Sequence, residues 1–260
     1  MIKKNSFSLL PLFTGLMYLF LYLPITLLIL FSFNDDQFAY GWVGFTTKWY
    51  HMLFHSVEVW DALKNSVIIA SMAVILSLSM GTLLVFNSNK RIMKQLMMLF
   101  YGSIAVPEIV LAVGLLSFFS FFFVTLGLST LIVCHTLIGL GYVVPIIYTQ
   151  YNGLDKSIIE VAYDLGATRR QAFFTVILPL ILPALVSGGL LVFIISFDDF
   201  ILSFFCSGAT TQTLPVYIFS VIRAGASPMI NAVSTLLLLT SSLLMLFLFS
   251  VQVKKRMDMW

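Results

Sequence analysis

The chain has 260 residues, 60% of them hydrophobic and 10% charged, with a mean hydropathy of +1.03. Soluble domains carry about 25% charged residues, so this composition excludes a water-soluble domain. The net charge of +3 is too small to indicate a nucleic-acid partner. Cys134 and Cys206 lie in or next to apolar segments without CxxC spacing, which predicts packed thiols and no metal site. The scattered His51, His55 and His135 are interpreted as interfacial residues.

The first apolar run, Leu9 to Phe33, follows Lys3 and Lys4 and exceeds the apolar core of a signal peptide, which is about 7–15 residues. We therefore interpret it as a membrane span. Because a crossing needs about 20 apolar residues, the sequence predicts six spanning helices in one all-α membrane domain over residues 1–260. The predicted spans are Leu9–Phe33, Asn65–Phe86, Gly102–Phe123, Ser129–Tyr148, Leu180–Phe205 and Ile230–Val251.

The basic residues favour a topology with both termini in the cytoplasm. In that orientation, all of the 14 basic residues except Lys48, Lys64 and Arg223 fall in cytoplasmic segments. Cytoplasmic loops of membrane proteins are enriched in Lys and Arg, so the distribution predicts the orientation. The polar segment Glu160–Pro179 then faces the cytoplasm.

Two predicted external segments differ in character. Asn34 to Lys64 combines four acidic residues with Trp42, Trp49 and Trp60. These aromatic side chains are expected to anchor the chain at the membrane interface, and the alternative is a surface that receives a cationic ligand or a docking protein. The segment Ser207–Met229 is rich in turn formers with an apolar middle, and it predicts a short helix at the outer surface.

Three carboxylates, Glu108, Asp198 and Asp199, fall inside predicted spans. An ionised Asp at the bilayer centre costs about 2.5–3.5 kcal/mol on insertion scales, so such residues are expected to face a protein interior or a water-filled path. Pro107 is expected to kink the helix beside Glu108.

We find no basic residue in the spans to pair with these three groups, which leaves protonation, a cation from a partner subunit, or a transported cation. Neighbouring helical residues diverge by about 100°, so either Asp198 or Asp199 is expected to serve packing or a backbone contact. The alternative is that all three are structural hydrogen-bonding groups.

The segment Glu160–Pro179 reads EVAYDLGATRRQAFFTVILP and is the longest polar interval in the second half of the chain. Gly166 predicts a turn between two short helices. The pattern of Glu160, Ala162, Gly166 and the later Leu-Pro resembles the cytoplasmic EAA loop of bacterial ABC importer permeases, with Val161 where Ala is usual. The resemblance implies a type I importer fold and assigns coupling to a separate ATPase to Glu160, Ala162, Asp164, Gly166 and Arg169.

The stretch from Ile159 to Ala232 is also similar to the C-type permease subunits of spermidine/putrescine ABC importers, through YDLGAT, SFDDFILSFF and LPVYIFSVIRAGASPMINA. By that resemblance Glu108, Asp198 and Asp199 line the substrate path. Polyamines are chains of protonated amines, which carboxylates compensate while aromatic faces pack the methylenes. An anion importer is expected to prefer basic or neutral polar groups in its path.

The resemblance further implies the partners of a multi-pass protein of the bacterial inner membrane. These are membrane lipid, a second similar permease, two copies of a cytoplasmic ATPase and an external polyamine-binding protein. ATP and magnesium belong to the ATPase, because this chain has no GxxxxGK[ST] sequence and is expected to bind no cofactor and to catalyse no reaction. The alternatives are an importer permease for another small solute, an ion-driven secondary carrier and an intramembrane enzyme.

Overall fold

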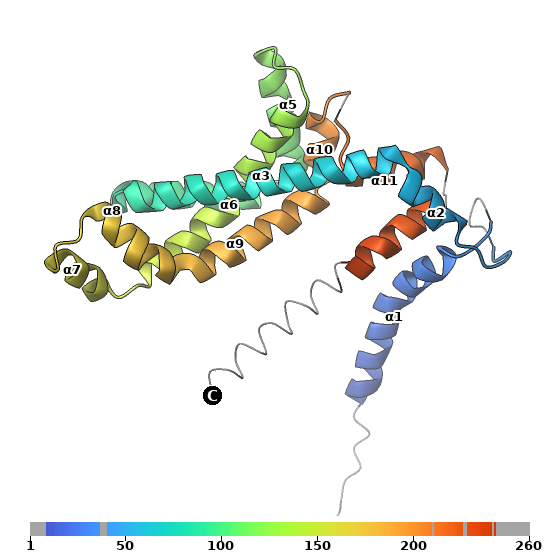
Figure 1. Cartoon of the computed structure of the whole chain (residues 1–260), viewed down its shortest axis with the longest axis horizontal. Helices are drawn as coiled ribbons and strands as arrows, with labels where there is room; N and C mark the ends of the chain where they lie inside the picture. The colour runs from blue at the N-terminus through green and yellow to red at the C-terminus, as the bar shows by residue number, and fades with distance from the viewer. Residues whose placement is uncertain (1–8, 37–40, 210, 226–227, 241, 243–260) are drawn as a thin grey trace, which may run out of the picture. The chain divides into compact units, whose positions relative to one another are not determined.

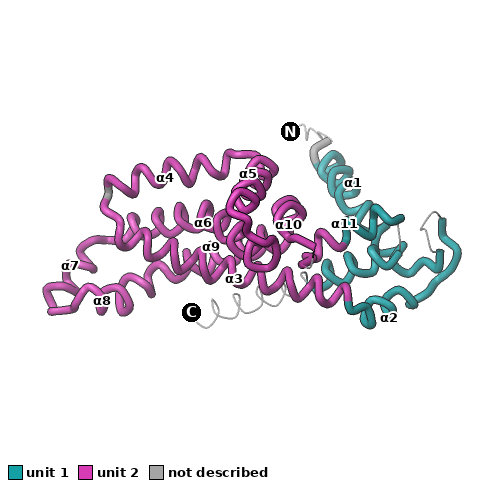
Figure 2. The backbone as a smooth tube through the Cα atoms, turned by 90° about the horizontal axis from the view of Figure 1, so that it is seen from above, with its two compact units in different colours: residues 1–57, 218–260 teal, residues 58–217 magenta. Residues whose placement is uncertain are grey.

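The computed structural model describes residues 9–36, 41–209, 211–225, 228–240 and 242. Over these residues the regular secondary structure is helical, apart from one isolated bridge between Asn34 and Phe45. It divides into two compact units, residues 1–57 with 218–260, and residues 58–217 (Figure 2). The second unit holds the candidate site.

Three long helices run side by side in the second unit: α3 (Val57–Asn87), α6 (Leu128–Asn152) and α9 (Leu178–Asp198) (Figure 1). In the most apolar part of α6, 61% of the residues are buried, against 33% in α3, so α6 is the central helix. The main core is built on Val143, Val144 and Ile147 of α6. All three side chains are at most 1% exposed.

Small residues let these helices approach closely. A Cβ atom at Gly139 of α6 would lie 2.9 Å from Val192 Cγ1 on α9 and 3.0 Å from Ser77 Oγ on α3. Such contacts are typical of helix packing in membranes, where small residues allow close backbones. Gly139 therefore fixes the spacing of α6 with both neighbours.

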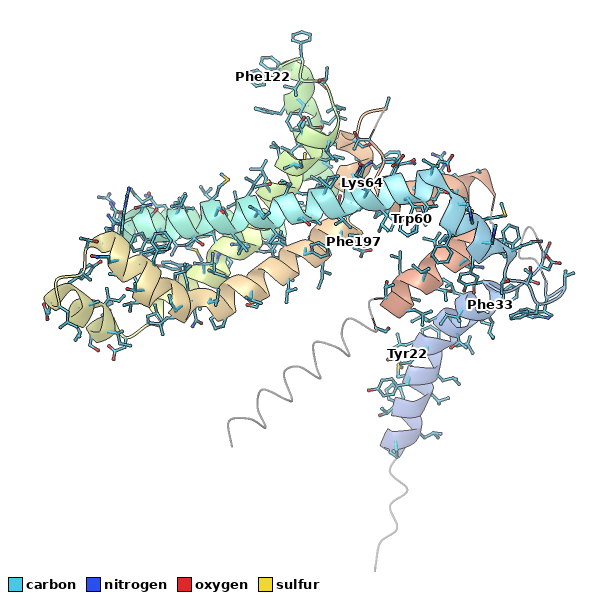
Figure 3. All side chains as sticks on the ribbon, viewed as in Figure 1. Tyr22, Phe33, Trp60, Lys64, Phe122 and Phe197 are labelled. Carbon is cyan, nitrogen blue, oxygen red and sulfur yellow. The ribbon has the colours of Figure 1, made fainter. Side chains whose placement is uncertain are left out.

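The third predicted span, Gly102–Phe123, is wrong as a single helix. The chain instead forms α4 (Lys90–Ala105) and α5 (Glu108–Phe121), which meet at an angle of 107°. Pro107 disfavours helical dihedrals in the preceding residue, and Val106 is accordingly extended with ψ 131°. α5 then leads to the exposed Phe122, just beyond the helix end (Figure 3).

The fifth predicted span, Leu180–Phe205, is displaced in the structure. One continuous helix runs from Arg169 to Asp198, through α8 (Arg169–Ala172), a π-helical turn η1 (Phe173–Ile177) and α9. The helix stops at Asp199, which is extended with ψ 121°, and a separate α10 (Ile201–Cys206) follows. The two carboxylates therefore stand at a break in the helix.

The first unit begins with α1 (Leu9–Phe31), close to the predicted first span, and also holds α2 (Lys48–His55). The prediction of an interfacial or ligand-receiving Trp49 is wrong, because Trp49 is 6% exposed and its Nε1 donates to the Asn34 carbonyl at 2.7 Å. Trp42 in this unit, and Trp60 at the start of α3, are exposed.

A helix is present in the segment 207–229, as predicted: α11 (Leu214–Ala224). Four helices in the described residues are long and apolar enough to cross a membrane, and the bent α4–α5 pair would make a fifth. A shorter apolar helix, Pro228–Thr240, covers the first half of the sixth predicted span, Ile230–Val251. The remainder of that span and the basic residues of both termini lie outside the described residues.

Candidate functional site

A cavity of about 1030 Å³ opens beside the two helix breaks, lined by residues of α4, α5, α6, α9 and α10. All three carboxylates singled out in the sequence, Glu108, Asp198 and Asp199, line it. They come from segments about 90 residues apart in the chain, and the breaks at Pro107 and Asp199 bring them to one wall. Helices broken within the membrane expose polar groups where they line a cavity.

Glu108 is the first residue of α5, and its side chain is half-buried. At this position the positive end of the helix dipole favours a carboxylate. Glu108 also shares a small recess of about 10 Å³ with Asp199. Two carboxylates in such proximity repel each other unless a cation or a proton lies between them.

Asp199 and Asp198 have different surroundings. Asp199 is 7% exposed, and its carboxylate accepts hydrogen bonds from the backbone N–H groups of Ser203 at 2.9 Å and Leu202 at 3.3 Å, which caps α10. The prediction that one of the two residues serves a backbone contact is confirmed. Asp198 is exposed to the cavity, and in the described part of the chain its carboxylate has no hydrogen-bond or ion-pair partner.

His135 belongs to this site, and its interpretation as an interfacial residue is wrong. Its side chain on α6 is buried, with Nδ1 2.8 Å from Ser196 Oγ and Nε2 3.5 Å from Asp199 Oδ2. Nε2 also lies 3.4 Å from Ser203 Oγ. The conclusion that no basic residue lies in a span is therefore wrong, because His135 lies inside the predicted span Ser129–Tyr148. Its position in the sequence was enough to consider it as a partner of the three carboxylates.

The rest of the cavity wall is mainly apolar and aromatic. Phe100, Tyr142 and Phe200 line it, and no Lys or Arg occurs among the described residues that line the cavity. Carboxylates with aromatic and aliphatic surfaces between them suit a cation that carries methylene groups. Cys134 on α6 and Cys206 at the end of α10 are buried free thiols in the same hydrophobic cluster, as predicted.

The predicted helix–turn–helix at 156–179 is confirmed. Asp155 caps the N-terminus of α7 (Lys156–Asp164), and its carboxylate accepts from the Ser157 N–H at 3.0 Å. This hydrogen bond and the interaction with the Ser157 side chain hold the pKa of Asp155 below its ordinary value of 3.8. Gly166, with φ 84°, forms the turn, and α8 follows.

The residues expected to couple to an ATPase are not equivalent in the structure. Glu160 and Asp164 are exposed on α7, where no side chain is buried, and the Ala162 carbonyl accepts the Ala167 N–H in the turn. Arg169 instead contacts α3: its Nη2 donates to the Phe86 carbonyl at 2.9 Å. α7 thus offers a free surface, whereas Arg169 holds the turn to the helices.

Residues 73–255 match the family described as "Binding-protein-dependent transport system inner membrane component". The chain belongs to this family. It is therefore a multi-pass inner-membrane permease component of a bacterial ABC importer, without catalytic activity of its own, as the EAA-like pattern predicted. Membership excludes the ion-driven carrier and the intramembrane enzyme, and it implies an ATPase and a binding protein as partners.

Curated relatives of this permease are similar over most of their length. The spermidine/putrescine transport system permease protein PotC of Haemophilus influenzae is 36% identical over 236 residues, covering 88% of this chain and 90% of the relative. PotC of Escherichia coli K12 is 34% identical, covering 88% of each chain. The putrescine transport system permease protein PotI of the same strain is 34% identical, covering 84% of this permease and 82% of PotI.

Solved structures support the permease fold. A bacterial ABC transporter involved in the import of alginate matches with a TM-score of 0.70 and 14% identity, covering 97% of this chain and 98% of that chain. The inward-facing MetNI methionine transporter matches with a TM-score of 0.58 and 19% identity, covering 78% of this chain and 94% of that chain.

Proposed function

We propose that this permease moves polyamines of the spermidine and putrescine type into the cytoplasm. The observation that carries the proposal is the cavity of about 1030 Å³ in which Glu108, Asp198 and Asp199 meet aromatic side chains without a Lys or Arg among its described lining residues. Curated relatives named for spermidine and putrescine transport support the same substrate class. A permease for an anionic solute would place its carboxylates against the charge of its own substrate.

The test is uptake of radiolabelled spermidine by the assembled importer, comparing wild type with Glu108→Gln and Asp198→Asn. Each change keeps the size and hydrogen-bonding capacity of the side chain and removes its possible charge. We expect uptake to fall by about tenfold or more, which corresponds to the loss of one charge-assisted contact, while assembly and basal ATP hydrolysis persist. Glu108→Asp and Asp198→Glu are the matched controls, because they retain the charge and are expected to retain part of the uptake. Full uptake by both neutral variants would remove these carboxylates from the path.

The importer would couple transport to ATP through the segment 156–179. α7 exposes the apolar side chains of Ile158 and Val161 beside Glu160 and Asp164, and Leu165, directly after the helix, is 83% exposed. An amphipathic helix of this kind fits a groove on a soluble partner. In this proposal the partner is the ATPase, present in two copies with its own ATP and magnesium, and this chain binds no cofactor. A second, similar permease and an external polyamine-binding protein complete the assembly.

The proposal includes six spans in one domain over residues 1–260, with both termini in the cytoplasm. A membrane-impermeant maleimide tests the orientation. A cysteine at Ser157, in the first turn of α7, should react only from the cytoplasmic side, and a cysteine at the exposed Val43 only from outside. Reaction of both from the same side would contradict the topology.

A further inference from the structure

His135 connects α6 with α9 and α10, the two helices on either side of the break at Asp199. It stands on α6, its Nδ1 lies 2.8 Å from Ser196 Oγ on α9, and its Nε2 lies 3.4 Å from Ser203 Oγ on α10. All three side chains are more than nine-tenths buried. A polar group buried without partners is costly, so this cluster forms a specific connection rather than generic packing.

We assign the tautomer of His135 from its neighbours. Nε2 lies 3.5 Å from Asp199 Oδ2 and 3.4 Å from Ser203 Oγ, and the assignment places the hydrogen on Nε2, because an ionised carboxylate can only accept hydrogen bonds. Nδ1 then accepts from the Ser196 hydroxyl. In this arrangement His135 presents a donor to Asp199 Oδ2 while both oxygens of Asp199 already accept backbone N–H groups of α10.

We propose that His135 is a positioning residue of the transport site. It holds the Asp199 carboxylate on the first turn of α10, and this leaves Asp198 and Glu108 as the carboxylates that meet the substrate. The Asp199 carboxylate is thereby engaged by groups of the protein itself, although it lines the cavity. Asp198 is turned to the same cavity, and no partner engages it among the described residues. The inference rests on the proposed function, which it refines by dividing the roles of the three carboxylates.

The structure provides a selective substitution series at His135. Gln places a side-chain nitrogen near the position of Nε2, Asn places one near Nδ1, and Leu retains volume without either. If the donor to Asp199 matters, spermidine uptake should follow the order wild type, Gln, Asn, Leu, with His135→Leu about tenfold below wild type as for loss of one hydrogen bond to a charged group. Basal ATP hydrolysis should remain unchanged. Equal loss in all three variants would overturn the role of Nε2.

A double-mutant cycle tests whether His135 acts through Asp199. His135→Leu should cause little further loss in an Asp199→Ala background, because the carboxylate that accepts from Nε2 is absent there, whereas its effect should add to that of Asp198→Asn. Thr136→Val is the matched control: Thr136 is the next residue on α6, it is buried, and its hydroxyl bonds only its own helix at the Ile132 carbonyl. Additive losses in both backgrounds would reduce His135 to a packing residue and overturn the proposal.

Hydrogen exchange at the Leu202 and Ser203 amides gives a readout that does not depend on the substrate. Both amides should exchange faster in His135→Leu than in wild type and in Thr136→Val, because Asp199 loses the group that orients it. Unchanged exchange would overturn the positioning role even if uptake fell. Conversely, a wild-type importer that takes up no spermidine would overturn the proposed substrate, while the exchange result would still decide the role of His135.

Discussion

The Arg169 guanidinium stacks 4.7 Å above the Phe86 ring while its Nη2 donates to the Phe86 carbonyl at 2.9 Å. The same nitrogen lies 3.4 Å from Asn87 Oδ1. These contacts join the first turn of α8 to the last turn of α3, and α4 begins three residues later at Lys90. Arg169 therefore ties the 156–179 segment to α3 at the end that leads into α4.

Replacement of Arg169 should weaken the coupling between ATP hydrolysis and transport. Arg169→Ala removes the stack and the hydrogen bond, and a cation–π contact at an exposed site contributes about 0.5–1 kcal/mol. We expect fewer substrate molecules imported per ATP hydrolysed, with the importer still assembled. Arg169→Lys should resemble the Ala variant, because Lys lacks the planar guanidinium that stacks on the Phe86 ring and donates to the Phe86 carbonyl at the same time.

The neighbouring Arg170 supplies the control for charge. It is exposed on the same helix, and in the described residues its side chain makes no hydrogen bond or ion pair. Arg170→Ala should retain the wild-type ratio of uptake to hydrolysis. A loss in Arg170→Ala equal to that in Arg169→Ala would indicate a general charge effect and contradict the link to α3.

Gly166 should tolerate substitution poorly for a backbone reason alone. Its φ of 84° lies in the left-handed region, yet a Cβ at this position would meet no atom within 4 Å. For an ordinary L-residue that conformation costs roughly 1–2 kcal/mol. Gly166→Val is expected to abolish spermidine uptake while ATP hydrolysis continues, and Gly166→Asn should retain more uptake, because Asn enters this region more readily. Equal, normal uptake in both variants would show that the turn does not transmit the coupling.

The local features that could be predicted from the sequence depend on residues close together in the chain. Gly166 and the polar residues around it are sufficient to predict the turn between α7 and α8, and apolar runs of about 20 residues are sufficient for α1, α3 and α6. The kink at Pro107 follows from proline geometry. Its size, 107°, does not, because the angle depends on how α5 packs against α10.

The candidate site was predicted only in part, because its partners are distant in sequence. Composition and span prediction identified Glu108, Asp198 and Asp199 as carboxylates inside membrane spans, where an ionised group has a high free-energy cost. Hydropathy could not reveal that the helix stops at Asp199, since Leu180–Phe205 is strongly apolar on both sides of the two Asp residues. His135 was missed because it was judged by metal-ligand spacing, whereas its partner is a carboxylate 64 residues away.

Acidification should loosen the start of α7. The pKa of Asp155 is lowered by the Ser157 N–H hydrogen bond, so the ionised form is favoured in the folded helix. Its contribution is therefore fully present above the ordinary pKa of 3.8 and is lost as the pH falls through the lower, folded value. Hydrogen exchange of the Ser157 and Ile158 amides, corrected for intrinsic rates, should accelerate over that window. The Asp155→Asn variant should show a weaker pH response, and an identical response in wild type and variant would contradict the assignment.

Gly139 should be intolerant of even one added methyl group. The Cβ of Gly139→Ala would lie 2.9 Å from Val192 Cγ1, inside van der Waals contact, so α9 must shift or Val192 must change rotamer. Overpacking of this kind typically costs about 1–3 kcal/mol. Gly139 and Val192 both line the recess that holds His135 and Asp199, so the displacement should also reduce transport. Thermal unfolding of the purified permease and spermidine uptake measure the two effects.

Gly114 on α5 is the control for the change from Gly to Ala, because a Cβ there would meet no atom within 4 Å. Gly114→Ala should be neutral or slightly stabilising, since Ala is the better helix former. The combination of Gly139→Ala with Val192→Ala should recover part of the loss, because the second change removes the methyl groups with which the new Cβ collides. If the double variant were less stable than the two single changes predict by addition, the steric contact between α6 and α9 would not be the cause.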